Sequence, residues 1–189
     1  MKTAADIRLG LWGVLLALPL LAGAGIRNGD FSQGLQSWKT AWHVTAADGE
    51  VLLADTAAPH AFAFQAIPCG TGSTLTVAFD FRNSLAATNA AGTFRDSFYA
   101  SLYEVDDPAG FVLEHDKFGA SRGLMDLDAG GPFDVHGAVT NSAKGAGWSR
   151  YSGTFSATCS NVVVVFELYD LNLSPGDSAV RIDNVVVTP

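Results

Sequence analysis

Charged residues are scarce in this chain, and positively charged residues are the scarcest. Of its 189 residues only 16% are Asp, Glu, Lys or Arg, with 11 basic against 19 acidic residues and a net charge of −8. Nucleic acids and anionic membrane surfaces are bound through clustered Lys and Arg side chains that neutralise phosphate charge. The charge balance therefore argues against both kinds of partner.

The chain also lacks an apolar run of membrane-spanning length. Its one extended apolar segment, residues 9–21, is interrupted by glycine and proline, and about 13 residues cannot cross about 30 Å of hydrocarbon as a helix. Basic residues precede this segment, and Ala22-Gly23-Ala24 follows with the small-x-small form of a cleavage site. We interpret residues 1–24 as a signal peptide rather than an anchor. We expect residues 25–189 to be secreted, extracellular or periplasmic, without a membrane span.

Cysteine is nearly absent, with only Cys69 and Cys159. An even number of cysteines in an exported chain is typical of disulfide bonding, and two cysteines permit a single intramolecular pairing. We therefore expect a Cys69–Cys159 disulfide. The alternative, a catalytic cysteine–histidine pair, needs a reactive thiolate and has no supporting motif.

No stretch shows the 3.6-residue period of an amphipathic helix, whereas apolar residues alternate with polar ones in many short segments. Turn-forming Gly, Asn, Asp, Ser and Pro clusters separate these segments. The expected strands are residues 50–54, 61–67, 74–82, 96–103, 151–155, 161–169 and 179–187. Seven or more strands without interleaved helices predict an all-β, two-sheet antiparallel β-sandwich, or jelly roll, as a single domain. We expect long loops over residues 114–147, where periodicity is weak.

Two segments at opposite ends of the chain carry a family resemblance. Residues 28–38, Asn-Gly-Asp-Phe-Ser-Gln-Gly-Leu-Gln-Ser-Trp, resemble the opening of galactose-binding-like jelly rolls, especially carbohydrate-binding modules related to families 4, 9 and 22. Residues 147–155, 165–168 and 180–185 resemble the final strands of the same modules. The resemblance implies a sandwich with Trp38 packed in its core, and carbohydrate binding as the leading function. A superfold hosts many functions, so the fold alone does not establish this one.

In that family a structural calcium commonly joins the first strand to the last. The resemblance places a late acidic ligand at Asp183 and a carbonyl ligand at Gly29, whereas the acidic position after the early Phe is Ser32 here. Calcium takes six to eight oxygen ligands, so Asp30, Glu50 or Asp55 would have to supply a carboxylate. We expect a structural calcium on Gly29, Asp30, Glu50 and Asp183. The alternative is that the acidic residues cap turns at the sheet ends.

If one parity of each strand faces the core, the other parity faces solvent. This solvent-facing set combines flat aromatic rings with planar polar groups, which suits the apolar C–H faces and the hydroxyls of sugars. With the freer loop residue Trp42, the candidate ligand-binding residues are Asp80, Arg82, Tyr99, Tyr103, Trp148, Arg150, Glu167 and Tyr169. The alternative is that these residues only stabilise the sheet through cross-strand pairs.

Short sequence patterns that resemble catalytic or metal-binding motifs occur in the chain, but the neighbouring residues that each motif requires are missing. Residues 119–123 match the G-x-S-x-G pattern, but no crossover helix follows. Residues 126–131 resemble a calcium loop without the glutamate that an EF-hand needs, and we expect an acidic surface loop there. The four histidines show no zinc-ligand spacing.

We therefore expect no enzyme activity, and a secreted protein that recognises a polysaccharide or a cell-surface glycan. The alternative is an extracellular structural or adhesion protein whose sandwich contacts a cell-surface protein or matrix partner. A small hydrolase or lyase is a third hypothesis, which no motif supports.

Overall fold

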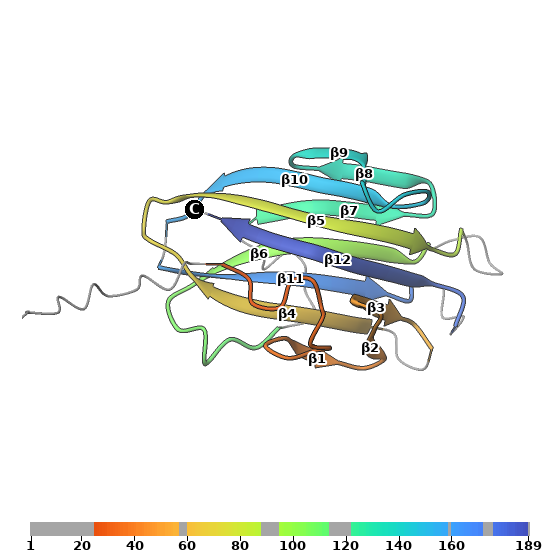
Figure 1. Cartoon of the computed structure of the whole chain (residues 1–189), viewed down its shortest axis with the longest axis horizontal. Helices are drawn as coiled ribbons and strands as arrows, with labels where there is room; N and C mark the ends of the chain where they lie inside the picture. Colours follow the sequence, from red (N-terminus) through yellow and green to blue (C-terminus); the bar gives the residue numbers. More distant parts are fainter. Residues whose placement is uncertain are drawn as a thin grey trace, which may run out of the picture.

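A computed structural model describes residues 25–56, 60–87, 95–113, 122–158, 160–171 and 176–188. Within these residues the chain forms β-strands and no helix (Figure 1). The strands are β1 (Lys39–Ala41), β2 (Val44–Ala47), β3 (Glu50–Ala54), β4 (His60–Pro68), β5 (Thr74–Ser84), β6 (Ser97–Val105), β7 (Arg122–Asp128), β8 (Gly131–Val135), β9 (Ala138–Asn141), β10 (Ser149–Ser156), β11 (Asn161–Tyr169) and β12 (Ala179–Thr188). The seven strands expected from the sequence are all present, with ends shifted by at most two residues.

The strands form two antiparallel sheets of six strands each. Sheet A has the order β1-β4-β11-β6-β7-β8, and sheet B has the order β2-β3-β12-β5-β10-β9. The two sheets lie face to face in Figure 1, with the last strand, β12, at the centre of sheet B. The predicted two-sheet antiparallel sandwich is confirmed.

Alternating apolar residues build the core between the sheets. On β5 the buried residues Leu75, Val77 and Phe79 point inward, and Phe166 of β11 meets them from sheet A. The rings of Phe166 and Phe79 meet edge to face with centroids 4.9 Å apart. Trp38 is buried against Phe166, with centroids 5.9 Å apart, which confirms its predicted place in the core.

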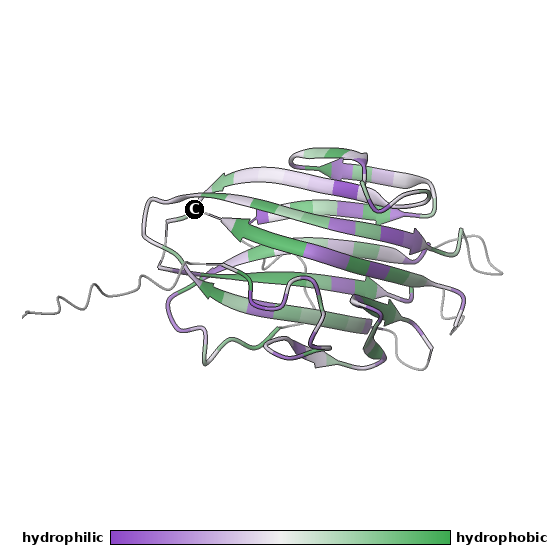
Figure 2. Ribbon diagram, viewed as in Figure 1, coloured by the Kyte–Doolittle hydropathy of each residue, from purple (hydrophilic) through white to green (hydrophobic). Residues whose placement is uncertain are grey.

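The neighbouring strands β4 and β11 of sheet A are apolar on both faces, and Figure 2 shows hydrophobic residues along both of them. The outward residues Val163 and Val165 of β11 are fully buried in a second cluster with Phe64, Tyr103 and Leu113. The Phe111 ring lies over this cluster, 5.3 Å from both the Phe64 and the Tyr103 rings. The segment that follows β6 therefore covers one end of the outer face of sheet A.

The expectation of long loops over residues 114–147 is wrong for residues 122–141. This stretch forms β7, β8 and β9, of which β8 and β9 are the edge strands of the two sheets and β7 pairs with β6 and β8. Edge strands are held by backbone pairing along one side and bury few side chains, as the largely exposed β8 shows. Their sequences therefore carry little hydrophobic periodicity. Residues 114–121 lie outside the described part of the chain.

Candidate functional site: the aromatic outer face of sheet A

The residues predicted to share one ligand-binding face are divided between two opposite faces. Tyr99, Tyr103, Glu167 and Tyr169 belong to the outer face of sheet A. The remaining residues of the sheets, Asp80, Arg82, Trp148 and Arg150, lie on or beside the outer face of sheet B. The expectation of a single face is corrected, because β5 and β10 pair in one sheet whereas β6 and β11 pair in the other.

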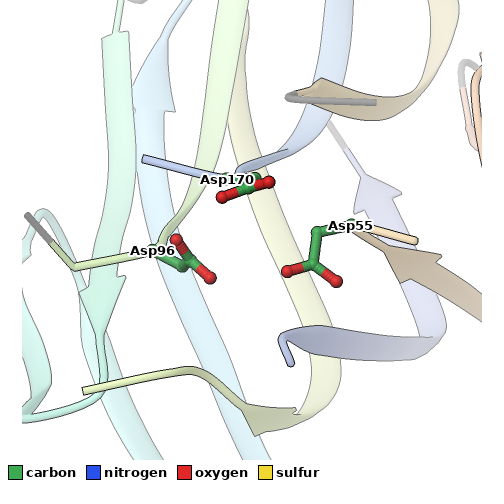
Figure 3. A group of neighbouring side chains, drawn as sticks. All are labelled: Asp55, Asp96 and Asp170. Atoms are coloured by element: carbon green, nitrogen blue, oxygen red, sulfur yellow. The ribbon is translucent and has the colours of Figure 1, made fainter. Parts of the chain in front are cut away.

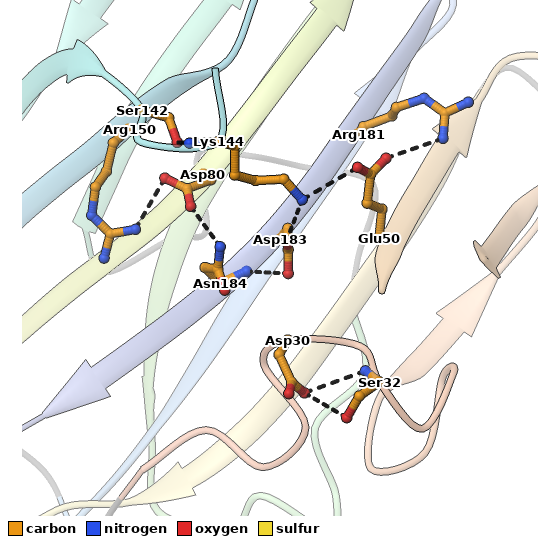
Figure 4. A network of polar contacts seen from close by, with 10 residues as sticks. All are labelled: Asp30, Ser32, Glu50, Asp80, Ser142, Lys144, Arg150, Arg181, Asp183 and Asn184. Carbon is orange, nitrogen blue, oxygen red and sulfur yellow. Dashed lines mark hydrogen bonds and ion pairs between the residues drawn. The ribbon is translucent and has the colours of Figure 1, made fainter. Parts of the chain in front are cut away.

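On sheet B the predicted ligand residues are engaged with one another or with their neighbours (Figure 4). Arg150 Nη1 donates to Asp80 Oδ1 at 3.0 Å, and Asn184 Nδ2 donates to Asp80 Oδ2 at 2.8 Å. Trp148 is buried, and the Arg82 guanidinium lies 5.3 Å from the centre of its ring. These contacts satisfy the polar groups within the sheet, so this face offers a ligand little.

The outer face of sheet A is different because three aromatic side chains on or beside it, Trp42, Phe62 and Tyr169, are exposed or partly exposed. Trp42 follows β1 and is 47% exposed. Its ring lies 5.9 Å from His60 and 6.0 Å from Phe62, both on β4. Phe62 and Tyr169 are partly buried. We call this surface the aromatic face, defined by Trp42, His60, Phe62, Tyr99, Glu167 and Tyr169.

A buried histidine–glutamate pair within the aromatic face holds the neighbouring tyrosine in place. His60 and Glu167 are paired through Nε2 and Oε1 at 3.0 Å, and their side chains are 3% and 0% exposed. Tyr169 donates its hydroxyl to the same Glu167 Oε1 at 2.8 Å, and its ring stacks on His60 with centroids 4.2 Å apart. The Tyr169 ring is therefore held in one orientation.

Burial, together with the charge and the hydrogen bond of Glu167, raises the pKa of the Tyr169 hydroxyl. The phenol therefore stays protonated and remains a hydrogen-bond donor to Glu167. The ring then acts as a fixed flat surface, and its polar end is already satisfied.

Among the described residues, two buried polar atoms on this face have no hydrogen-bond partner, Glu167 Oε2 and Ser101 Oγ. The residues are diagonal neighbours, because Glu167 lies opposite Tyr99 and Ser101 lies opposite Val165. An unsatisfied buried acceptor costs about 1–3 kcal/mol. A water molecule or a polar ligand group that reached these atoms would offset that cost.

The sequence analysis missed His60 and Phe62. The signal was present in β4, where the aromatic series His60, Phe62 and Phe64 alternates with Ala61 and Ala63. A strand that is apolar on both parities is covered on both faces, and the larger side chains here lie on the outer one.

The residues predicted to bind calcium do not form an open cation site. Glu50 Oε1 and Asp183 Oδ2 both pair with the Lys144 ammonium (Figure 4). The Gly29 carbonyl accepts the Val185 amide at 2.9 Å, and Asp30 Oδ1 accepts the amide and the hydroxyl of Ser32. The four residues as arranged do not fit the six to eight oxygens of calcium.

A second acidic group, not predicted as a unit, lies at one end of the sandwich. Asp55, Asp96 and Asp170 are all buried, with carboxylate oxygens within 4.8 Å of one another (Figure 3). Asp55 accepts the amides of Gly176 at 2.8 Å and Ser178 at 3.1 Å. Asp96 accepts the amide of Leu171 at 3.0 Å and the hydroxyl of Ser178 at 2.5 Å.

These bonds account for the oxygens of Asp55 and Asp96. They join the segment before β12 to the end of β3 and the start of β6, and the start of β6 to the segment after β11. Burial is the main cause that raises the pKa of Asp55, from 3.8 to about 6, and Asp177 adds to the rise. Carboxylate oxygens are the donor type that hard cations take. Their hydrogen bonds nevertheless give the group a structural role without an ion.

The catalytic patterns remain without context. Gly123 of the G-x-S-x-G pattern lies in β7, not on a strand-to-helix turn, and lines a cleft of about 590 Å³ with Arg122, His136 and Thr154. Residues 119–121 lie outside the described part. The acidic surface loop expected over residues 126–131 is instead a hairpin between β7 and β8. Asp128 Oδ1 accepts the Gly130 amide in its turn.

Several predictions concern residues outside the described part of the chain. The signal peptide is one of them, since the description begins at residue 25. Cys159 is another, so the disulfide stays a prediction. The amide of buried Cys69 donates to the carbonyl of Ser160, the chain neighbour of Cys159, at 2.8 Å. In the described residues we find no helix of the length and apolarity needed to cross a membrane.

Comparison with known proteins gives similarity of fold only. No family model matches the sequence, and no curated protein matches it. Among solved structures, a family 4 carbohydrate-binding module is 16% identical with a TM-score of 0.50, covering 87% of this chain and 99% of that one. The enzymatically active domain of tailspike protein 4 of bacteriophage CBA120 is 14% identical with a TM-score of 0.54, covering 88% of this chain.

The chain spans about a fifth of that tailspike domain, 21% of its length. A family 61 module in complex with β-1,4-galactotriose is 10% identical with a TM-score of 0.48, covering 87% of this chain and 97% of that one. The similarity to the family 4 module confirms the jelly-roll fold that the resemblance implied for this chain.

Proposed function

We propose that this protein is a secreted, non-catalytic binding protein that holds a carbohydrate chain on the aromatic face of sheet A. The observation that carries the proposal is the grouping of Trp42, Phe62 and Tyr169 around the buried His60–Glu167 pair. Partly exposed rings in fixed orientations suit the apolar faces of sugars. The fold similarity to carbohydrate-binding modules supports the same function without establishing it.

The surroundings of the two sheets support the choice of the aromatic face as the binding surface. The outer face of sheet B is filled by its own ion pairs, and one end of the sheet A face is covered by Phe111 and Leu113. On the rest of this face the exposed Trp42 ring lies beside His60, and Glu167 Oε2 and Ser101 Oγ are buried without a hydrogen-bond partner among the described residues. A sugar hydroxyl, or a water molecule beneath it, that reached these two atoms could donate a hydrogen bond to them.

The test is affinity electrophoresis of the purified protein in gels that contain single soluble polysaccharides, followed by titration calorimetry with the glycan that retards it. We expect saturable binding to one glycan class, and we expect Trp42→Ala to weaken it at least tenfold, about 1.4 kcal/mol. Phe133→Ala is the matched control, because Phe133 of β8 is 59% exposed but lies away from the aromatic face.

Equal losses in both variants would show that the binding surface lies elsewhere. Free migration of the folded protein through every gel would contradict carbohydrate binding and favour the adhesion alternative. Release of new reducing or unsaturated ends from the glycan would contradict the non-catalytic part of the proposal.

A further inference from the structure

The side chain of Lys144 lies across the outer face of sheet B and reaches strands that are not next to its turn. Lys144 belongs to the turn between β9 and β10, at one edge of the sheet, yet its ammonium reaches β12 and β3 (Figure 4). Nζ lies 3.2 Å from Glu50 Oε1 and forms a second, shorter ion pair with Asp183 Oδ2. One cation therefore joins two carboxylates from neighbouring strands.

The turn that carries Lys144 is held rigidly, which fixes the position of the ammonium. The Lys144 amide donates to Ser142 Oγ at 3.1 Å, and the Ser142 amide donates to the Trp148 carbonyl at 3.1 Å. The Lys144 ammonium also lies 4.2 Å from the centre of the buried Trp148 ring, at cation–π distance. The lysine thus has anionic partners on one side and a π-face on another.

The three charged groups are largely removed from solvent. The side chains of Lys144, Glu50 and Asp183 are 22%, 18% and 10% exposed. Burial alone lowers the pKa of Lys144, but the hydrogen bonds and charges of Asp183 and Glu50 outweigh it and raise that pKa above its ordinary value. Lys144 therefore stays charged at neutral pH.

We propose that the Lys144 ammonium is the resident structural cation of this domain and occupies the place that a divalent cation would take between Glu50 and Asp183. The structure consequently needs no calcium at this position. Removal of the lysine leaves two neighbouring carboxylates, of which Glu50 keeps its ion pair with Arg181. A substitute cation between them would relieve the remaining repulsion, because like charges at this burial repel strongly. Lys144→Met should therefore convert a calcium-independent protein into a calcium-responsive one.

The experiment measures the melting temperature of the purified wild type and of Lys144→Met, each with excess EDTA and with calcium at about 5 mM. For the wild type we expect a difference below about 1 °C between the two conditions. For Lys144→Met in EDTA we expect a melting temperature about 5 °C below the wild type. Calcium should recover at least about 2 °C of this loss, as for a site of roughly millimolar affinity.

Two further variants separate this effect from simple loss of a contact. Arg181 is the other cation beside Glu50: its Nη1 lies 3.3 Å from Glu50 Oε2, but it forms no ion pair with Asp183. The variant Arg181→Met should therefore gain no calcium response. The double variant Lys144→Met with Asp183→Asn removes the repulsion, so it should melt above Lys144→Met in EDTA and ignore calcium.

Equal responses of the wild type and Lys144→Met to calcium would overturn the proposal, whatever other acidic group binds the ion. So would a wild type that melts earlier in EDTA and loses this dependence when Glu50 is replaced by Gln. If Lys144→Met folds only in the presence of calcium, the proposal is supported.

Discussion

Asp55 provides a sharp test of the electrostatics, because burial raises its pKa from 3.8 to about 6. A raised carboxyl pKa means that the folded state takes up a proton at a higher pH than the unfolded state does. The resulting stabilisation is complete below about pH 4 and is lost as the pH rises through 6. Each pKa unit corresponds to 1.36 kcal/mol, so the full effect on the free energy of unfolding is about 3 kcal/mol. About 2 kcal/mol of this is gained when the pH falls from 7.5 to 4.5.

The variant Asp55→Asn removes this titration. Its side-chain carbonyl can still accept one of the two amides, Gly176 or Ser178, that the carboxylate accepts, so some stability is lost at every pH. The informative quantity is the difference between the two proteins. We expect the wild type to gain about 2 kcal/mol more than Asp55→Asn between pH 7.5 and 4.5.

The assay is urea unfolding followed by tryptophan fluorescence at several pH values, in which this difference moves the midpoint by about 1 M. Asp48→Asn is the matched control. Asp48 is exposed in the turn between β2 and β3, and asparagine tolerates its positive φ of 56°. Parallel pH curves for the wild type and Asp55→Asn would refute the reasoning.

Two further predictions concern covalent and steric features. Gly153→Ala should destabilise the protein by about 2–4 kcal/mol, because a Cβ there would overlap the Tyr151 hydroxyl and come within 2.7 Å of the His136 carbonyl that accepts this hydroxyl's hydrogen bond. The control Gly123→Ala, whose Cβ would lie 3.8 Å from the nearest side-chain atom, should cost under about 1 kcal/mol. Equal unfolding midpoints for the two variants would contradict this prediction. If Cys69 and Cys159 form a disulfide, thiol titration of the denatured, unreduced protein should find no free thiol, and reduction should cost about 2–4 kcal/mol; two reactive thiols without reductant would disprove the bond.

The strands at the centre of each sheet could be predicted because their own residues carry the information. Alternation in Leu75, Val77 and Phe79 shows a strand with one buried face, and the double-sided run from Val162 to Val165 shows one covered on both. The edge strands β8 and β9 could not be predicted in this way, since they bury too little for a pattern to appear.

The candidate site could be predicted only in part. Tyr169 and Glu167 were predicted from residue type and strand parity, and Trp42 as a freer loop residue, but His60, which contacts all three, was not predicted. His60 is 107 positions from Glu167 in the chain and becomes its neighbour only because β4 pairs with β11. Tyr99 and Asp80 looked equivalent in the sequence and lie on opposite faces, because β6 and β5 belong to different sheets.

The all-β sandwich could be predicted from the sequence, since side-chain alternation and turn residues act within a few positions of one another. Which charged side chains meet depends on the tertiary structure. Lys144 is 94 residues from Glu50 and 39 from Asp183, and no local pattern relates them. Strand order depends on which strand edges pair, and this is a non-local property. It places the Lys144 ammonium beside Asp183, the residue to which the resemblance had assigned a calcium ligand.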